Sequence, residues 1–354
     1  MTPLAKLLVQ RIISAGPISL ADFIADCLLH PTHGYYSTRD PLGAGGDFTT
    51  APEISQMFGE LIGLSLAKTW VDQGRPGSLT LAELGPGRGT LMADIMRATK
   101  SVSGFHAAAH IHLIEASPLL RARQRETLGD LHPTWIGNAN DLPAAPLYLV
   151  ANEFFDALPI RQFVRDGSAW RERQVGVQDG ALTLGLGATA PVAALDHRIG
   201  DTKPGDIVEI CPTAQPIIRA ITARIADRGG AALIIDYGGW RTLGDTFQAL
   251  MAHETADPLA DPGLADLTAH VDFEALTIAA RDVSHTRLTT QGVFLERLGI
   301  TQRAQNLAIN LSGAQLDAHV AAHRRLTHPA EMGSLFKVLG LFPNGMSPPP
   351  GLDP

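Results

Sequence analysis

Short apolar runs alternate with amphipathic stretches from residue 79 to residue 236, and this rhythm predicts strands that alternate with helices. Met92, Ile95 and Met96 have the spacing of a helix between two such runs. The runs are short and uninterrupted, which is typical of a parallel sheet covered on both faces. The pattern therefore predicts a doubly wound α/β core whose strands are Leu79–Leu84, Ile111–Glu115, Thr134–Gly137, Leu147–Ala151 and Ala231–Asp236.

The first 75 residues predict a helical cap in front of this core. Apolar residues between Leu4 and Ile12 recur at helical spacing, and Ser19 is suited to cap a second helix. A glycine-rich stretch follows, and Thr50-Ala-Pro-Glu53 has the pattern of a capping box. We expect residues 43–47 and the helix that begins near Thr50 to close over a bound ligand.

Two insertions and a tail interrupt or follow the core pattern of residues 76–342. Alternating residues with turns at Asp166-Gly167 and Asp179-Gly180 predict β-hairpins within residues 160–205. Residues 238–270 lack a clear period and are expected to form a lid. Ser284–Thr290 and Leu335–Leu341 are suited to a closing antiparallel strand pair, and residues 343–354 are expected to be a disordered tail.

Composition narrows the function classes. The 354 residues are 45% hydrophobic and 18% charged, which supports a folded core, and the net charge of −8 argues against a nucleic-acid partner. Cys27 and Cys211 stand alone, so neither a disulfide framework nor a zinc site is indicated. The sequence has no apolar run long enough to cross a bilayer, and Met1 to Gly16 lacks the pattern of a secretory signal. We expect no membrane insertion.

A glycine turn joins the first expected strand to a helix, in the sequence Glu83-Leu-Gly85-Pro-Gly87-Arg-Gly89-Thr90. A dinucleotide-binding fingerprint would have its third glycine at position 90, where this chain has threonine. A Walker loop would need a lysine before that threonine, and glycine stands there. The turn therefore differs from both phosphate-binding patterns.

Polar residues follow three of the expected strands. Glu115 ends the second strand, where doubly wound folds place a carboxylate for ribose hydroxyls, although the same geometry serves NAD. Asn140 and Asp141 follow the third strand, and Asn152-Glu153-Phe-Phe-Asp156 follows the fourth. Because the carboxyl ends of parallel strands share one edge of a sheet, we expect these residues to line one crevice.

The glycine turn resembles motif I of class I S-adenosylmethionine-dependent methyltransferases, in which the backbone approaches the methionine part of the cofactor. Several further motifs, in this order, resemble the MidA family, whose members are related to a mitochondrial complex I assembly factor that methylates an arginine. They are Gly34-Tyr-Tyr, Gly46-Asp-Phe-Thr-Thr-Ala-Pro-Glu-Ile-Ser-Gln-Met-Phe-Gly-Glu60, Glu83-Leu-Gly-Pro-Gly-Arg-Gly-Thr90, Asn152-Glu-Phe-Phe-Asp-Ala-Leu-Pro159, Asp236-Tyr-Gly238 and Leu267-Thr-Ala-His-Val-Asp-Phe273.

The resemblance implies a class I, Rossmann-like methyltransferase that uses S-adenosyl-L-methionine to methylate a protein arginine, with a respiratory complex I subunit as its partner. It implies the cytoplasm of a bacterium or the mitochondrial matrix of a eukaryote. The expected catalytic residues, which would hold the methylated nitrogen, are Glu153, Asp156 and Asp236. The expected cofactor-binding residues are Gly85, Pro86, Gly87, Gly89, Thr90, Glu115, Asn140, Asp141, Asn152 and Gln56.

Two alternatives stay open at this stage. One is an NAD-dependent oxidoreductase, against which the misplaced third glycine argues. The other is an assembly chaperone that keeps a methyltransferase fold as an interaction module. No metal is expected, because histidines such as His30 and His33 have no matching acid or cysteine cluster.

Overall fold

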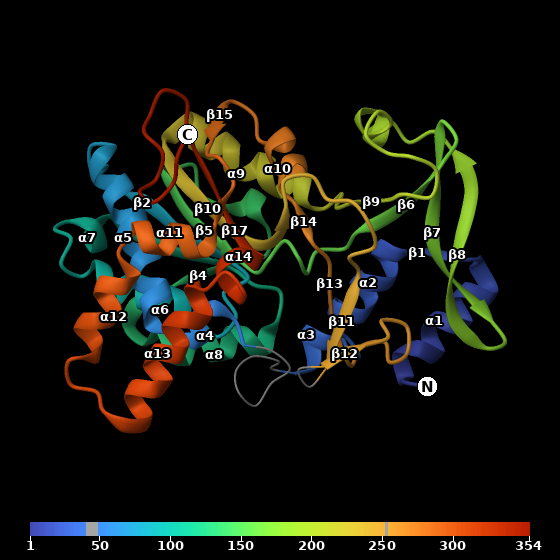
Figure 1. The fold of residues 1–354 in the computed structure, drawn as a ribbon, viewed down its shortest axis with the longest axis horizontal. Coiled ribbons are helices and arrows are strands. Elements are labelled where there is room, and N and C mark those ends of the chain that lie inside the picture. Colours follow the sequence, from blue (N-terminus) through green and yellow to red (C-terminus); the bar gives the residue numbers. More distant parts are fainter. Residues whose placement is uncertain (40–48, 252–253) are drawn as a thin grey trace.

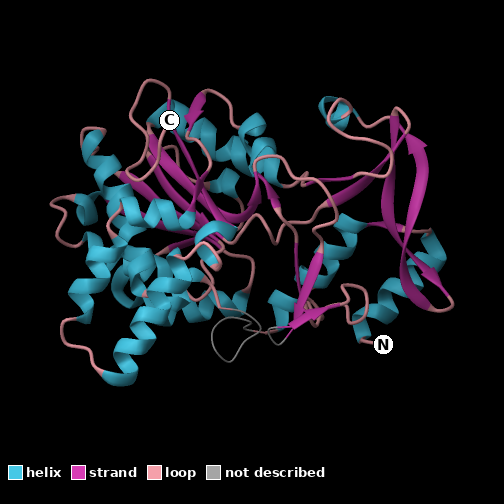
Figure 2. Ribbon diagram, in the orientation of Figure 1, coloured by secondary structure: helices cyan, strands magenta, loops and turns pink. Residues whose placement is uncertain are grey.

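The computed structural model describes residues 1–39, 49–251 and 254–354. A mostly parallel sheet lies at the centre of one lobe, with helices on both faces (Figures 1 and 2). Its parallel strands run in the spatial order β10, β5, β2, β3, β4. All five predicted strands are confirmed, as β2 (Leu79–Leu84), β3 (Ala109–Ile114), β4 (Thr134–Ile136), β5 (Leu147–Asn152) and β10 (Gly230–Gly239).

The antiparallel closure of this sheet is also confirmed. β17 (Phe336–Pro343) pairs antiparallel with β10 along one edge. β15 (Val283–His285) and β16 (Thr289–Thr290) in turn pair with β17. Since β17 lies near the end of the chain, its pairing with β10 joins residues that are far apart in sequence, such as Ala232 and Leu341.

Helices bury their apolar stripes against both faces of the sheet. One face packs on a cluster that includes Phe58, Ile95 and Ile300, and the other on Ile218 and Phe273. The first layer contains α5 (Gln56–Asp72), α6 (Thr90–Thr99), α11 (Gln291–Arg297) and α12 (Ile300–Ala308), and the second contains α9 (Ala214–Arg228) and α10 (Phe273–Ala279). Further elements are α7 (Phe105–Ala108), α8 (Pro118–Leu128), α13 (Gly313–Thr327), α14 (Met332–Leu335) and β14 (Val271–Asp272).

The helix expected from Thr50 is interrupted at Ser55, and its second part packs on the central sheet. Residues 1–75 therefore do not form a single cap, which corrects that prediction. α4 (Ala51–Ile54) ends at Ser55, whose backbone is extended with φ −160° and whose side chain caps α5. Met57 and Phe58 on α5 are fully buried in the cluster that covers the central sheet. α5 is therefore part of the core layer. The predicted closure by residues 43–47 lies outside the described residues.

The helices that precede residue 40 pack instead on a second, antiparallel sheet at the other side of the molecule (Figure 1). The apolar cluster there includes Phe23, Leu28 and Val175. The predicted hairpins are confirmed in this sheet, which extends beyond residue 205. Its members are β1 (Ile18–Ser19), β6 (Arg161–Asp166), β7 (Ala169–Gln178), β8 (Ala181–Ala190) and β9 (Ile207–Ile210), and the helices are α1 (Pro3–Ala15), α2 (Leu20–Leu29) and α3 (Tyr35–Thr38).

The second insertion, residues 238–270, contains a small sheet of β11 (Gln248–Met251), β12 (Glu254–Ala256) and β13 (Asp266–Thr268). It packs on the N-terminal helices. Thr2 Oγ1 donates to the Pro262 carbonyl at 2.9 Å, and Arg39 Nη1 donates to the Leu264 carbonyl at 3.1 Å. Strands of three or four residues are too short to show a period in the sequence.

The prediction of a disordered tail at residues 343–354 is wrong. Ser65 Oγ donates to the Pro350 carbonyl at 2.9 Å, and the Arg287 amide donates to the Asp353 carbonyl at 3.0 Å. Leu352 is 7% exposed and belongs to the cluster on the central sheet. A proline-rich segment has no helical or strand period, yet its carbonyls still accept hydrogen bonds. Across the described chain, no helix combines the length and apolar character needed to cross a membrane.

Candidate functional site

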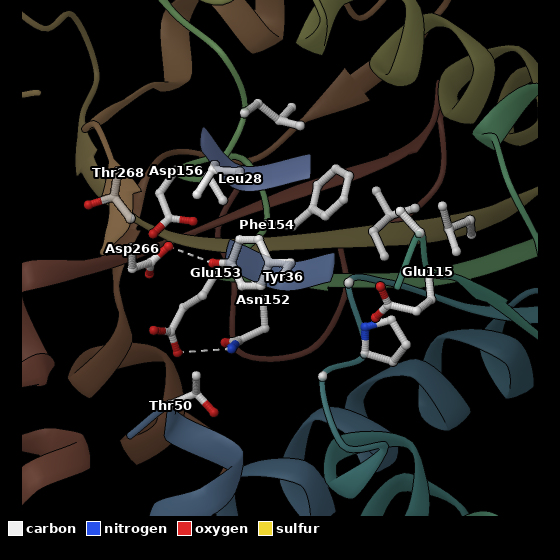
Figure 3. Close-up of a pocket in the computed structure, with 18 of the residues that line it drawn as sticks. Leu28, Tyr36, Thr50, Glu115, Asn152, Glu153, Phe154, Asp156, Asp266 and Thr268 are labelled. Carbon is white, nitrogen blue, oxygen red and sulfur yellow. Dashed lines mark hydrogen bonds between the residues drawn. The ribbon is translucent and has the colours of Figure 1, made fainter. Parts of the chain in front are cut away.

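A cavity of about 650 Å³ lies at the carboxyl ends of the central strands. It opens beside β2 and β5, where the strand order reverses, which is the position at which open α/β sheets bind ligands. Figure 3 shows Glu115 at one end of the cavity and Glu153, Asp156 and Asp266 at the other, with Phe154 between them. We call these the Glu115 end and the acidic end.

The glycine turn between β2 and α6 forms the wall of the Glu115 end. Gly85 and Gly87 line the cavity and have φ angles of +60° and +52°, which side chains disfavour. A Cβ on Gly85 would lie 3.0 Å from Cδ2 of Phe154. Gly89 is buried against α8 instead, since its Cβ would lie 3.5 Å from Cα of Gln124. Its expected contact with a ligand is therefore replaced by helix packing.

Glu115 lines the cavity, and the residue is only 8% exposed. Hydrogen bonds hold its carboxylate in place. Oε1 accepts from the Ser117 amide at 2.8 Å, and Oε2 accepts from Gln124 Nε2 at 3.1 Å. Gln124 Nε2 also donates to the Gly87 carbonyl at 2.7 Å, so this side chain ties the glycine turn to Glu115. The sequence gives no signal for Gln124, because glutamine is ordinary on a helix.

Glu115→Ala is expected to weaken S-adenosylmethionine binding at least about tenfold. Two hydrogen bonds from ribose hydroxyls to a carboxylate contribute roughly 1.5–3 kcal/mol each, and the substitution also releases Gln124. Calorimetric titration measures the loss. Glu126→Ala on the exposed face of α8 is the matched control and should bind normally. Unchanged affinity in Glu115→Ala would remove Glu115 from the cofactor site.

Two buried acceptors near the middle of the cavity have no hydrogen-bond partner among the described residues. They are Glu83 Oε2 and Asn152 Oδ1, and both residues line the cavity. Burial, together with the neighbouring Glu115 carboxylate, raises the pKa of Glu83 to about 8. Unpaired buried polar atoms are costly, so this part of the cavity suits a ligand that brings a donor for Asn152 Oδ1 and a polar group for the largely protonated Glu83 carboxyl.

At the acidic end, Glu153 stands directly after β5 with a left-handed backbone, φ +50°. Its Oε1 accepts from the Ala51 amide at 3.2 Å and from Asn152 Nδ2 at 3.1 Å (Figure 3). Burial raises its pKa to about 7. Burial and the Glu153 charge raise the pKa of Asp156 to about 7 as well, and Asp156 Oδ1 has no hydrogen-bond partner in the described chain. The carboxyl groups at this end therefore lose their protons near neutral pH.

Asp236, the third expected catalytic acid, does not line the cavity. It is fully buried, and its carboxylate accepts from the amides of Phe155 at 3.0 Å, Asp156 at 3.3 Å and Tyr237 at 3.0 Å. Burial and the charges of Asp156 and Glu153 raise its pKa well above the usual range. The structure thus corrects its role: Asp236 supports the turn that carries Asp156, and Tyr237 beside it lines the cavity.

Three expected cofactor ligands also lie away from the cavity wall. Gln56, Asn140 and Asp141 are exposed and do not line the cavity. The Asn140 carbonyl instead accepts from Arg224 Nη2 at 2.6 Å. Gly137, Asn138 and Ala139, just before them, line the cavity in their place. Of the remaining expected residues, Pro86 and Thr90 line the wall, and Thr90 Oγ1 donates to Glu53 Oε1 at 2.6 Å.

Two residues from outside the core complete the acidic end, and neither was expected. Tyr36 on α3 donates its hydroxyl to Asp266 Oδ1 on β13 at 2.8 Å. Both line the cavity. Their only sequence signal is position, since Tyr36 ends the MidA-like motif Gly34-Tyr-Tyr and Asp266 directly precedes the one that begins at Leu267. Among residues 1–39, 49–251 and 254–354, no group of three or more His, Cys, Asp or Glu side chains is arranged to hold a metal ion.

Comparisons with known proteins agree on one chemistry. Residues 61–293 match a family described as S-adenosyl-L-methionine-dependent methyltransferase. The mitochondrial protein arginine methyltransferase NDUFAF7 of Danio rerio is 38% identical over 95% of this chain and 86% of its own. The human protein of that name is 34% identical over 97% of this chain and 84% of its own.

A solved structure gives the same result for fold and cofactor. A Burkholderia thailandensis protein crystallised with S-adenosyl-homocysteine superposes with a TM-score of 0.84 at 31% identity, over 98% of this chain and 93% of its own. The predicted class I methyltransferase fold and S-adenosylmethionine as cofactor are confirmed.

Proposed function

Because this chain belongs to the S-adenosylmethionine-dependent methyltransferase family that includes the mitochondrial NDUFAF7 proteins, we propose that it methylates an arginine of a protein substrate. Arginine is proposed as the acceptor because one end of the cavity is acidic. Glu153 and Asp156 line it together with Asp266, so a cationic acceptor would be compensated there. Membership of this family also weighs against the NAD-dependent alternative.

The Glu115 end fits S-adenosylmethionine. Gly85 and Gly87 leave room for a ligand against the backbone, and Glu115 presents a fixed carboxylate for ribose hydroxyls. The unpaired oxygens Glu83 Oε2 and Asn152 Oδ1 suit polar groups of the cofactor's amino-acid part and sugar. When bound, the cofactor supplies an electrophilic methyl group on a positively charged sulfur.

The acidic end would prepare the acceptor nitrogen. A guanidinium is permanently charged at neutral pH, so its nitrogen must be oriented and must lose a proton as it is methylated. Glu153, fixed by the Ala51 amide and Asn152, would accept an N–H of the acceptor and take that proton. Asp156, with an unpaired Oδ1 in the same wall, would stabilise the charge that remains.

The partner that we propose is a subunit of respiratory complex I, as the MidA resemblance implies. The relatives reported above carry mitochondrial protein arginine methyltransferase in their names, which supports a protein substrate. We therefore infer action in the mitochondrial matrix for a eukaryotic chain and in the cytoplasm for a bacterial one.

Methyl transfer to complex I subunits tests this function. Subunits purified from cells that lack this protein are incubated with the enzyme and S-adenosylmethionine carrying a heavy methyl group, and peptides are read by mass spectrometry. We expect a heavy methyl mark on one arginine. Heavy methyl groups found only on residues other than arginine would contradict arginine methylation. Assembly that is restored fully by a transfer-dead variant would favour the chaperone alternative.

A further inference from the structure

Two segments outside the central sheet complete the wall of the acidic end. Tyr36 comes from the N-terminal helices, and Asp266 comes from the insertion between β10 and β14. Their side chains meet in the cavity, where the Tyr36 hydroxyl donates to Asp266 Oδ1 at 2.8 Å (Figure 3). The two segments are also joined behind these residues, because the Arg39 side chain donates from Nη1 to the Leu264 carbonyl. Asp266 is therefore held at a fixed place opposite β5.

Three carboxylates, those of Glu153, Asp156 and Asp266, line this end of the cavity. Asp156 and Asp266 are 6% and 4% exposed, and the pKa of Glu153, which burial raises, is raised further by the Asp266 charge and lowered by the Arg325 charge. Arg88 is the single arginine or lysine among the described residues of the cavity wall, and it lies at the glycine turn. Asp156 lines this cavity, and its Oδ1 is buried without a hydrogen-bond partner in the described chain. A guest that brings positive charge and N–H donors would complete the site.

The placement of the carboxylates favours one shape of cation. Glu153 projects from the end of β5 and Asp266 from β13, so the two acids face the cavity from different elements (Figure 3). A planar guanidinium has donors on two edges and can engage two carboxylates at once, whereas an ammonium is a compact point charge. Leu28 and Phe336 supply apolar lining for an alkyl stem.

We propose that Asp266, positioned by the Tyr36 hydroxyl, is the specificity residue that binds the guanidinium edge opposite Glu153 and selects arginine over lysine. This inference rests on the proposed function and extends it to a residue pair outside the core. Asp266 would contact the substrate directly. Tyr36 would act through Asp266 as a positioning residue, because its hydroxyl fixes Oδ1.

Binding of small side-chain analogues tests the assignment without catalysis. Ethylguanidinium and butylammonium are titrated by calorimetry into protein saturated with S-adenosyl-homocysteine. We expect the wild-type protein to prefer ethylguanidinium at least about tenfold. Asp266→Asn should reduce ethylguanidinium affinity at least about tenfold and abolish the preference. Tyr36→Phe should reduce the preference by a smaller factor, with butylammonium binding nearly unchanged.

Controls separate selectivity from folding. Asp257→Asn, an exposed acid of the same insertion, should bind both analogues as the wild type does. All variants should keep S-adenosyl-homocysteine affinity and melting temperature. An Asp266→Asn variant that retains the preference would overturn the assignment of Asp266. If the wild-type protein binds neither analogue, or prefers butylammonium, the assignment is also overturned.

The methylation assay distinguishes failure of this inference from failure of the proposed function. If the wild-type protein marks arginine but Asp266→Asn keeps its preference, the inference fails and the function stands. If the wild-type protein prefers butylammonium and marks lysine, both fail. If the preference depends on Asp266 and arginine is marked, both hold.

Discussion

Glu153→Gln is expected to reduce methyl transfer by about 10²-fold or more while cofactor affinity stays near normal. The amide can still accept from the Ala51 amide and Asn152, so local structure should persist. It cannot take a proton from the acceptor nitrogen, and such loss of a general base costs about 10²–10⁴-fold. Single-turnover transfer of labelled methyl groups and calorimetric titration with S-adenosyl-homocysteine measure the two quantities separately.

The control for this substitution is Glu126→Gln, which makes the same chemical change at an exposed position of α8. It should retain both activities. Parallel losses of transfer and cofactor affinity in Glu153→Gln would make Glu153 a cofactor ligand instead. Normal transfer would eliminate it from the chemistry.

The same group gives a pH dependence with a defined sign. Burial raises the pKa of Glu153 to about 7, so the carboxylate is progressively protonated below that pH. Transfer should therefore fall as pH drops from 8 to 6. Stability should change in the opposite direction, because a raised folded-state pKa means that the folded protein holds the proton more tightly than the unfolded chain. Glu153→Gln should then melt a few degrees above the wild type at pH 8, and this gain should shrink toward pH 5.

Gly87→Val is expected to abolish measurable cofactor binding, a loss of at least about 10²-fold. Gly87 has φ +52°, a conformation in which a β-branched residue is strained, and it lines the cavity that the cofactor would fill. Its carbonyl also accepts from Gln124, so displacement of this backbone would disturb Glu115 through the same side chain. Calorimetry with S-adenosyl-homocysteine measures the effect.

The control for backbone strain alone is Gly167→Val, in the turn between β6 and β7. Gly167 has φ +59°, and a Cβ there would meet no atom within 4 Å. This variant should lose some stability and bind the cofactor normally. If both variants bind normally, the glycine turn does not contact the cofactor.

The features that the sequence predicts well are those with a local physical cause. A strand buried on both faces needs an apolar run, so β2 and β5 could be located from the pattern of apolar residues along the chain. The glycine turn was equally readable, because backbone at φ +52° to +60° restricts Gly85 and Gly87 to that residue type. Glu115, Asn152 and Glu153 followed from the rule that strand ends meet at one edge.

The features that were missed depend on tertiary contacts. Gln124 is a site residue only because α8 packs beside the glycine turn, and Tyr36 meets Asp266 across 230 positions of sequence. Asp236 ends the strand that the sequence predicts, but in the structure it lies within β10 and its carboxylate accepts from three backbone amides. The break at Ser55 has a similar origin, since a serine that caps α5 cannot be told from one within a longer helix.

The meeting of Tyr36 and Asp266 has a consequence for how such a protein diverges. The central strands and the glycine turn form the Glu115 end, whereas α3 and β13 contribute to the acidic end from segments that the sheet does not need. Substitutions in these segments can therefore retarget the enzyme to a new acceptor while the methyl donor is retained. The two segments would have to be exchanged together between relatives, because Tyr36 on one is hydrogen-bonded to Asp266 on the other.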